Sequence, residues 1–316
     1  MTRKVLLVIL GMVLLFAPAV INADNGYRHR AVCLSLVPYV STSGSEAENT
    51  THNFALNLLG GYAGGLKGFE LGGLFNIDKG SVTGLQITPG ANYVGLDANA
   101  IQLAGVFNYS GWLNGGQLSL VNISGDVVGA QVGLVNIAND VQGAQIGLFN
   151  ISNEVIGPTV GVFNVSKRGQ FHIDLWVGDN TLPGVGVKMG SQYFHSVISF
   201  GAQPVADSLP DMWWMAGGGL GGHLTFDLLF VDIDLMAYMA NQFGGEELEF
   251  MPNLFKFQPT VGWLFPPDFA IFAGPTLNIF TSDVYDGRSI AAYDFTIVDN
   301  DNLKIWPGFV IGIQLR

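Results

Sequence analysis

Apolar residues alternate with polar or small ones along most of the second half of the chain. Residues 253–265 set Phe255, Phe257, Val261, Trp263 and Phe265 against Lys256, Gln258, Thr260 and Gly262. The same alternation runs through residues 227–240, 269–281 and 305–315. A period of two residues indicates β-strands with one apolar face. Strands of about ten residues or more are long enough to cross the hydrocarbon of a membrane when tilted.

Two architectures explain such strands. A soluble β-sandwich turns its apolar faces inward, whereas a membrane barrel turns them outward. The connections favour the barrel, because short links such as 226–228 and 265–268 alternate with long ones such as 201–212 and 241–252. Aromatic residues near the predicted strand ends fit an interfacial girdle: Trp213, Trp214, Trp263, Phe265 and Trp306. We therefore expect an antiparallel, outer-membrane-type β-barrel.

The middle of the chain repeats a strand-like unit every 14 residues. Gly129-Ala-Gln-Val-Gly-Leu-Val-Asn136 is followed by Gly143-Ala-Gln-Ile-Gly-Leu-Phe-Asn150. The asparagines that mark the period are Asn108, Asn122, Asn136, Asn150 and Asn164. A fixed period means that one supersecondary unit pairs or stacks with copies of itself.

Two arrangements accommodate the repeat. In the first, which we favour, each copy is a strand plus a tight turn, and the whole chain forms one meandering barrel of roughly 14 to 18 strands. Register argues against it, because two-residue turns would turn equivalent positions to opposite faces. In the second, the copies form a β-solenoid in which Gln131, Gln145 and Thr159 stack and the asparagines form a ladder. Residues 31–40 and 183–316 would then close a smaller barrel of about eight strands.

Composition places the chain in the cell envelope. Its 316 residues are 49% hydrophobic and only 12% charged, and the formal net charge of −12 argues against nucleic acid as a partner. Residues 1–23 have the charged start and apolar run of a secretory signal peptide. The lone cysteine, Cys33, excludes an intramolecular disulfide. We divide the chain into residues 1–23 (signal), 24–170 (N-terminal strands and repeats) and 171–316 (barrel strands), with membrane lipid as the expected partner.

The repeat also carries a resemblance. The run from Asn53 to Asn76, followed by the Gly-x-Gln-x-Gly-Leu-x-Asn copies, resembles a family of uncharacterised bacterial surface-repeat proteins. The resemblance covers roughly residues 31–170 and implies a secreted or outer-membrane location. It brings no catalytic residues, because none are established for the family.

Candidate chemistry lies on the polar faces of two neighbouring strands. Asp232 and Asp234 share one face, and Lys256 and Gln258 share the polar face of the next strand. In a barrel these side chains face the lumen, where they either tune the passage of an ion or solute or form a hydrogen-bonded plug. His172 and Asp174 are interpreted as a satisfied polar pair on one strand face. The five histidines have no metal-ligand spacing, so no metal or cofactor is expected.

The sequence thus predicts a non-enzymatic outer-membrane β-barrel protein, structural or pore-forming, whose solute is unknown. The alternative is a secreted or surface-exposed repeat protein that binds a host or polymer ligand. Its repeats would present a flat β-face with exposed rows of Gln and Thr.

Overall fold

The computed structural model describes residues 28–179, 183–202, 212–244, 253–265, 268–283, 290, 295–300 and 302–316. These residues form two compact units, divided between Gly115 and Gly116. The predicted signal peptide, residues 1–23, lies outside the described residues. In the part of the chain that the structure describes, no helix has both the length and the apolar character needed to cross a membrane.

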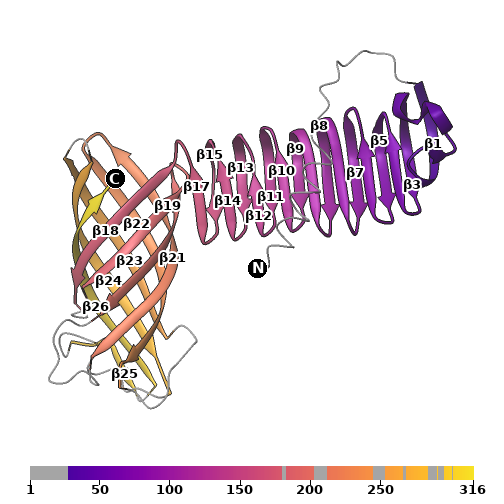
Figure 1. Cartoon of the computed structure of the whole chain (residues 1–316). Helices are drawn as coiled ribbons and strands as arrows, with labels where there is room; N and C mark the ends of the chain where they lie inside the picture. The colour runs from indigo at the N-terminus through magenta and orange to yellow at the C-terminus, as the bar shows by residue number, and fades with distance from the viewer. Residues whose placement is uncertain are drawn as a thin grey trace. The chain divides into compact units, whose positions relative to one another are not determined.

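The first unit is a β-solenoid in which each turn of the chain stacks on the one before (Figure 1). Its elements are β1 (Arg28–Val37), β2 (Val40–Ser41), the 3₁₀ helix η1 (Gly44–Asn49), β3 (Thr50–Asn57), β4 (Gly60–Ala63), β5 (Gly65–Gly72), β6 (Phe75–Asp78), β7 (Val82–Thr88), β8 (Ala91–Ala104) and β9 (Phe107–Leu118), which runs across the division. β1, β3, β5 and β7 pair in parallel in that order, as do β4, β6 and β8. Parallel stacking keeps equivalent residues on the same face, which a meander of hairpins does not.

The interior of the first unit is polar. Asn57 Nδ2 donates to Asn76 Oδ1 at 2.8 Å, Asn76 to Asn92 at 2.9 Å, and Asn92 to Asn108 at 2.9 Å. All four side chains are buried. A buried amide is stable only when its donors and acceptors are satisfied, and a ladder of identical amides meets this requirement in every coil.

The second unit continues the 14-residue repeat before it forms a barrel. Its coils contain β10 (Val121–Ser124), β11 (Val127–Val132), β12 (Val135–Ile137), β13 (Asp140–Ile146), β14 (Phe149–Ser152), β15 (Glu154–Ile156), β16 (Thr159–Val160) and β17 (Phe163–Ser166). β10, β12, β14 and β17 pair in parallel, and β11 pairs in parallel with β13. Each pairing joins equivalent positions of successive repeats, such as Asn136 with Asn150 and Gln131 with Gln145.

These coils also have a polar interior. Asn122, Asn136, Asn150 and Asn164 form a ladder with donor–acceptor distances of 2.9, 2.8 and 2.6 Å. Each of the first three amides also donates to the carbonyl of the next coil's Val132, Ile146 or Val160. A second ladder joins Gln145 to Gln131 and Gln131 to Gln117, both at 2.9 Å. The exposed positions are instead apolar: Leu118, Leu120, Val128, Leu134, Ile146, Leu148, Phe149, Ile151, Ile156, Val162, Phe163 and Val165.

The glycine that opens each repeat is fixed by backbone geometry. Gly143 has a φ of 145°, and a Cβ placed on it would lie 1.8 Å from the carbonyl oxygen of Gly129 in the preceding coil. Gly129 and Gly157 have φ values of 135° and 138°. Only glycine adopts this conformation readily and allows such close backbone approach, so the repeat requires it.

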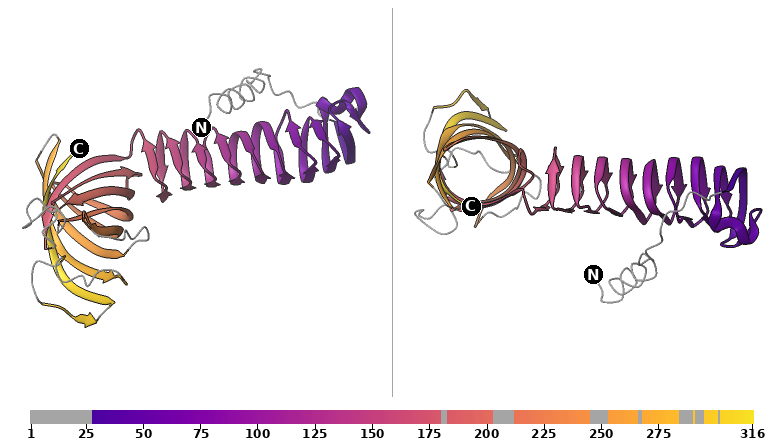
Figure 2. Two further views of the ribbon diagram at one scale, coloured as in Figure 1. Left: turned by 60° about the horizontal axis from the view of Figure 1, so that its bottom comes forward. Right: turned by 90° about the horizontal axis from the view of Figure 1, so that it is seen from above.

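The rest of the second unit is a closed antiparallel barrel. Its strands are β18 (Gln170–Gly178), β19 (Gly184–Gly190), β20 (Phe194–Ala202), β21 (Trp213–Phe226), β22 (Leu229–Gln242), β23 (Leu254–Phe265), β24 (Phe269–Thr281) and β26 (Leu303–Leu315). Neighbours in this order are hydrogen-bonded, and β18 pairs with β26 to close eight strands. Figure 2 shows the resulting ring. The short strand β25 (Val298–Asn300) adds to β26 at one end.

The barrel has an apolar outer surface and a filled interior. Leu235, Val261 and Phe309 point outward and are 62%, 54% and 52% exposed. A cluster inside the barrel contains aromatic and apolar side chains: Val197, Trp213, Met215, Met236, Tyr238, Ala240, Leu254, Phe280, Ile290 and Trp306. A second buried apolar cluster contains Phe230, Ala270, Phe272 and Val310, and polar side chains lie between and beside the two clusters.

The predicted all-β fold class with an antiparallel barrel is confirmed, in the arrangement given as the alternative. The favoured arrangement, with the 14-residue repeats as barrel strands, is wrong, because the copies pair in parallel with one another. Residues 31–40 do not belong to the barrel either, since β1 pairs with β2 and β3 of the first unit. The register objection identified the cause: only stacking leaves every Asn on one side.

Candidate functional site

The candidate site is a cluster of ionisable side chains inside the barrel. Strand alternation turns Asp232 and Asp234 of β22 toward the lumen, where they are 0% and 1% exposed. Leu235 and the other odd-numbered apolar residues of β22 turn outward. On the β23 side, Asp234 is in register with Gln258 and Asp232 with Thr260. On the β21 side, Asp232 is in register with His223 and Asp234 with Gly221.

Lys188 of β19 is the centre of this cluster. Its Nζ lies 2.7 Å from Asp232 Oδ2, 2.9 Å from Asp234 Oδ2 and 3.3 Å from Asp174 Oδ2. The Lys188 side chain is 4% exposed. A buried ammonium is tolerated when carboxylates surround it. Here β18 supplies Asp174, and β22 supplies Asp232 and Asp234.

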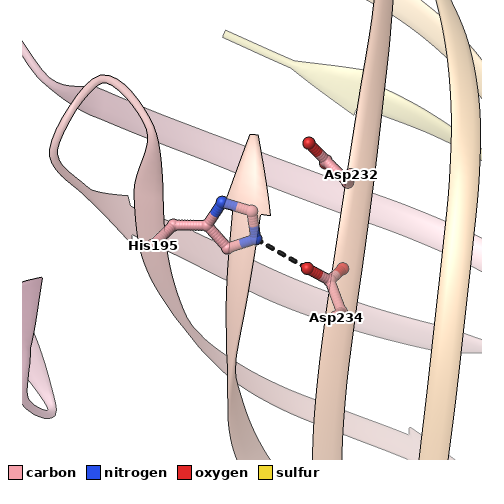
Figure 3. A group of neighbouring side chains, drawn as sticks. All are labelled: His195, Asp232 and Asp234. Atoms are coloured by element: carbon pink, nitrogen blue, oxygen red, sulfur yellow. Dashed lines mark hydrogen bonds and ion pairs between the residues drawn. The ribbon is translucent and has the colours of Figure 1, made fainter. Parts of the chain in front are cut away.

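Histidine and glutamine side chains satisfy the remaining carboxylate oxygens. His195 Nε2 lies 2.7 Å from Asp234 Oδ1, and the imidazole points directly at that carboxylate (Figure 3). His223 Nδ1 is bonded to Asp232 Oδ1, and Gln314 Nε2 donates to Asp174 Oδ1 at 3.0 Å. Both oxygens of each carboxylate therefore have a partner. We call the six ionisable residues Asp174, Lys188, His195, His223, Asp232 and Asp234 the lumen cluster.

A glycine-rich stretch of β21 makes room for the lumen cluster. A Cβ placed on Gly221 would lie 2.0 Å from Asp234 Oδ1 and 2.3 Å from His195 Nε2. Gly219 is similarly close to Met236, at 2.4 Å from its Sδ. Gly222, which turns outward, has nothing nearer than 3.9 Å. Gly219 and Gly221 are thus required by packing on the lumen side, whereas Gly222 is free of such a constraint.

A second polar group lies further along the lumen, around Asp179. Its carboxylate accepts hydrogen bonds from Trp306 Nε1 at 2.7 Å, Asn278 Nδ2 at 2.9 Å and Thr276 Oγ1 at 3.1 Å. Lys256 is buried on the lumen face of β23, opposite Asn278 of β24. Among the described residues, no carboxylate lies within ion-pair distance of Lys256, so it is not part of the lumen cluster.

A metal ion is one conceivable occupant of the lumen cluster. One ligand atom each from His195, Asp232 and Asp234 lies within 4.8 Å of the others. However, Lys188 Nζ already contacts both aspartates at hydrogen-bonding distance. The ammonium supplies the positive charge that a metal would bring, and it occupies the position between the carboxylates.

The burial of the cluster bears on its chemistry. Its members are at most 5% exposed, so they are almost completely buried. Side chains that line a water-filled channel would be accessible, whereas these fill the barrel at their level. The arrangement acts as an ion-paired plug that links β18, β19, β20, β21 and β22 across the lumen.

The structure places the predicted lumen residues Asp232, Asp234, Lys256 and Gln258 on inward-facing strand positions. It brings only the two aspartates into the lumen cluster. Sequence reasoning missed Lys188, the cation that joins them. In the sequence, Lys188 is a single lysine in an alternating strand. The residues around it do not indicate that it pairs with Asp232, which lies 44 residues further along the chain.

The repeat asparagines form the solenoid ladders rather than a ligand site. Asn122, Asn136, Asn150 and Asn164 lie inside the coils of the second unit, and Asn108 lies inside the first unit. The Gln and Thr rows that a binding face was expected to display are buried as well, at Gln131, Gln145 and Thr159. A comparison of the chain with protein-family models, curated proteins and solved structures found no match.

Proposed function

We propose that the chain is a non-enzymatic bacterial outer-membrane protein with a structural role, whose barrel spans the membrane and is closed by the lumen cluster. One observation carries this proposal. The barrel wall is apolar outside, and its interior contains a buried, ion-paired polar cluster beside apolar side chains, whereas a water-soluble barrel has a polar outer surface. A contiguous apolar surface of this extent is unfavourable in water. Lipid hydrocarbon surrounds a membrane barrel and would bury this surface on all sides.

The dimensions of the barrel support the same function. Strands β21 and β22 each have 14 residues, and β24 and β26 have 13. At about 3.3 Å per residue and a tilt of about 40°, they span roughly 33 to 35 Å, enough for a hydrocarbon layer of about 25 to 30 Å. Closure leaves no fully open sheet edge, so most backbone groups of the wall pair with a neighbouring strand.

The connections support an orientation. Short turns join β19 to β20, β21 to β22 and β23 to β24, and longer connections join the strands at the other end. Outer-membrane barrels keep short turns in the periplasm and long loops outside the cell. In this orientation, Gln170 and Arg316, at the short-turn end, face the periplasm, and the solenoid coils join the barrel from that side.

A structural role follows from the plug. Acid–base catalysis needs a carboxylate or imidazole that a substrate can reach, and the lumen cluster is buried with both oxygens of each carboxylate occupied. Ion conduction needs a continuous wet path, which the cluster blocks at its level. We infer that the barrel holds the solenoid at the membrane.

The proposal is tested by migration of the full chain in SDS gels. The outer-membrane fraction is compared before and after boiling, following expression with the native N-terminal segment. A compact, faster band before boiling is expected, because a closed barrel resists SDS. Recovery of the chain outside the membrane fraction, with no shift on boiling, would overturn the proposal and favour a secreted binding protein.

A further inference from the structure

The coils of the second unit have the same inverted polarity as the barrel wall. Between Gly116 and Ser166 the only charged residues are Asp126, Asp140 and Glu154, and all three lie at the turns of one edge. We call this the polar edge. The opposite edge is formed by Leu120, Leu134, Leu148 and Val162, which are 41% to 53% exposed. We call this the apolar edge, and both sheet faces next to it are also apolar.

Several backbone groups of the apolar edge pair with neighbouring coils. Leu134 N donates to Leu120 O at 2.9 Å, Phe149 N to Leu134 O at 2.9 Å, and Phe163 N to Leu148 O at 2.9 Å. Carbonyls next to these turns accept hydrogen bonds from the asparagine ladder, since Asn136 Nδ2 donates to Ile146 O. An unpaired N–H or C=O is costly in hydrocarbon, so paired turns are a condition for lipid contact that ordinary surface turns do not meet.

The last coil is fixed against the outside of the barrel wall. Asn164 Nδ2 donates to Ser196 Oγ at 2.7 Å, so the end of the amide ladder bonds to an outward side chain of β20. The apolar edge reaches the middle of the wall, where Leu148 and Val162 line an apolar groove of about 490 Å³ with Leu220 of β21. The polar edge lies toward the short turns, since the chain runs from Arg168 through Gly169, which packs on Gly190, into β18.

These contacts set the depth of each edge. Leu220 lies six residues before Phe226, the last residue of β21 at the short-turn end. Six residues rise about 15 Å along the barrel axis at a tilt of about 40°, which is half of a hydrocarbon core of about 30 Å. The apolar edge is therefore near the middle of the bilayer, and the polar edge is near the headgroups on the short-turn side.

We propose that the coils of residues 116–166 are embedded in a single leaflet, the one at the short-turn end of the barrel, with lipid acyl chains covering both sheet faces and the apolar edge. This proposal rests on the proposed membrane location of the barrel. Lipid is the proposed occupant of the exposed apolar surface, because that surface is continuous with the barrel wall through the groove at Leu148, Val162 and Leu220.

The test measures the depth of single fluorescent labels in the full chain, reconstituted in phosphatidylcholine vesicles. The background is Cys33→Ala, and the labelled sites are Leu134→Cys on the apolar edge, Asn139→Cys on the polar edge and Val261→Cys on the barrel wall. All three native side chains are on the surface, so labelling leaves the interior intact. Quenching is compared between lipids brominated deep in the acyl chain and aqueous iodide.

We expect strong bromolipid quenching at positions 134 and 261, and iodide quenching at position 139. Bromolipid quenching at 261 combined with iodide quenching at 134 would overturn the leaflet proposal and leave the barrel in the membrane. Absence of bromolipid quenching at 261 would overturn both. A label at position 134 protected from both quenchers would also contradict the proposal, because protein, such as a second copy of the chain, would then cover that edge.

Discussion

Lys188 lies within ion-pair distance of three carboxylates, and no other lysine or arginine among the described residues does so. Removing one partner of a buried ion pair leaves the opposing charges uncompensated, which costs about 3 to 5 kcal/mol. We therefore expect Lys188→Met to lower the free energy of unfolding of the barrel by about that amount. The measurement is a guanidinium titration of the chain in detergent micelles, followed by tryptophan fluorescence.

Arg168→Met is the matched control for this substitution. Arg168 forms an ion pair of the same length with Glu154, 2.7 Å, but its side chain is 65% exposed. Exposed pairs contribute about 0 to 1 kcal/mol, so this variant is expected to unfold at nearly the same denaturant concentration as the native chain. Equal losses in the two variants would contradict the central role of Lys188.

Two adjacent glycines of β21 test the packing of the lumen. Gly221→Ala places a methyl group against the bonded pair of His195 and Asp234, and overpacking of this kind costs about 1 to 3 kcal/mol. Gly222→Ala faces outward into open space and is expected to be neutral or slightly stabilising. The temperature at which the compact gel band disappears distinguishes them, and a larger loss for Gly222→Ala would refute the inward assignment of residue 221.

We expect the first unit to lose stability when His52 is protonated at acid pH. The pKa of His52 is lowered from 6.5 to about 4, mainly by burial and in addition by the neighbouring Arg30 and His29. Because the folded state favours the neutral imidazole, the stabilisation is complete above pH 6.5 and is lost as the pH falls toward about 4. The loss is on the order of 3 kcal/mol. Hydrogen exchange of peptides from residues 50–57, corrected for intrinsic rates, reports it, and His52→Gln is expected to flatten the change.

For Asp78 we expect the opposite dependence of stability on pH. Burial raises the pKa of Asp78 well above its ordinary value, and the nearby Glu70 raises it further. Since the folded state favours the protonated carboxyl, its contribution is present at low pH and is lost as the pH rises through the raised pKa. Asp78→Asn keeps an acceptor for Gln86 Nε2, which donates to Asp78 Oδ2 at 2.8 Å. This variant is expected to remove the loss of exchange protection that follows as the pH rises above the ordinary aspartate range, and an unchanged profile would refute it.

At the scale of an element, the coil depends on an amide that is both donor and acceptor. Asn136 accepts from Asn122 and donates to Asn150 and to the carbonyl of Ile146. Asn136→Asp keeps the shape but removes both donors, and each buried group left unsatisfied costs about 1 to 3 kcal/mol. Asn139→Asp makes the same change at an exposed turn and is expected to have little effect. Exchange protection of residues 121–152 measures the difference, and equal protection in both variants would contradict the ladder's contribution.

Alternation along single strands made the barrel elements predictable. The inward positions of Asp232 and Asp234 follow from a period of two, and the structure has them there. The same periodicity does not indicate which strands pair with one another. A repeat of 14 residues fits either a hairpin or a coil, because both contain strands of similar length, and only the Asn register separates the two. Contacts across the lumen, such as Lys188 with Asp232, depend on closure and have no local signature.

At the scale of the second unit, polarity is inverted in two different architectures. The barrel satisfies its inner polar groups with ion pairs, and the coils satisfy theirs with amide ladders. Both leave Leu, Ile, Val and Phe on the outside. A core of hydrogen-bonded amides adds little net free energy in water, so burial of the exposed apolar faces, as we propose in lipid, is expected to stabilise the coils.

Each coil of the second unit meets the next through the same contacts, at Gly, Gln and Asn positions that recur every 14 residues. The contacts with the barrel, such as Asn164 with Ser196 and Val162 with Leu220, are confined to the last coils. The stack therefore contains no information about its own length. Copying or deleting a whole repeat, for example residues 129–142, preserves every junction, whereas removing 13 residues breaks all of them. The length of the solenoid is thus set by the number of repeats. It can change by whole repeats without any change in the side chains that join neighbouring coils.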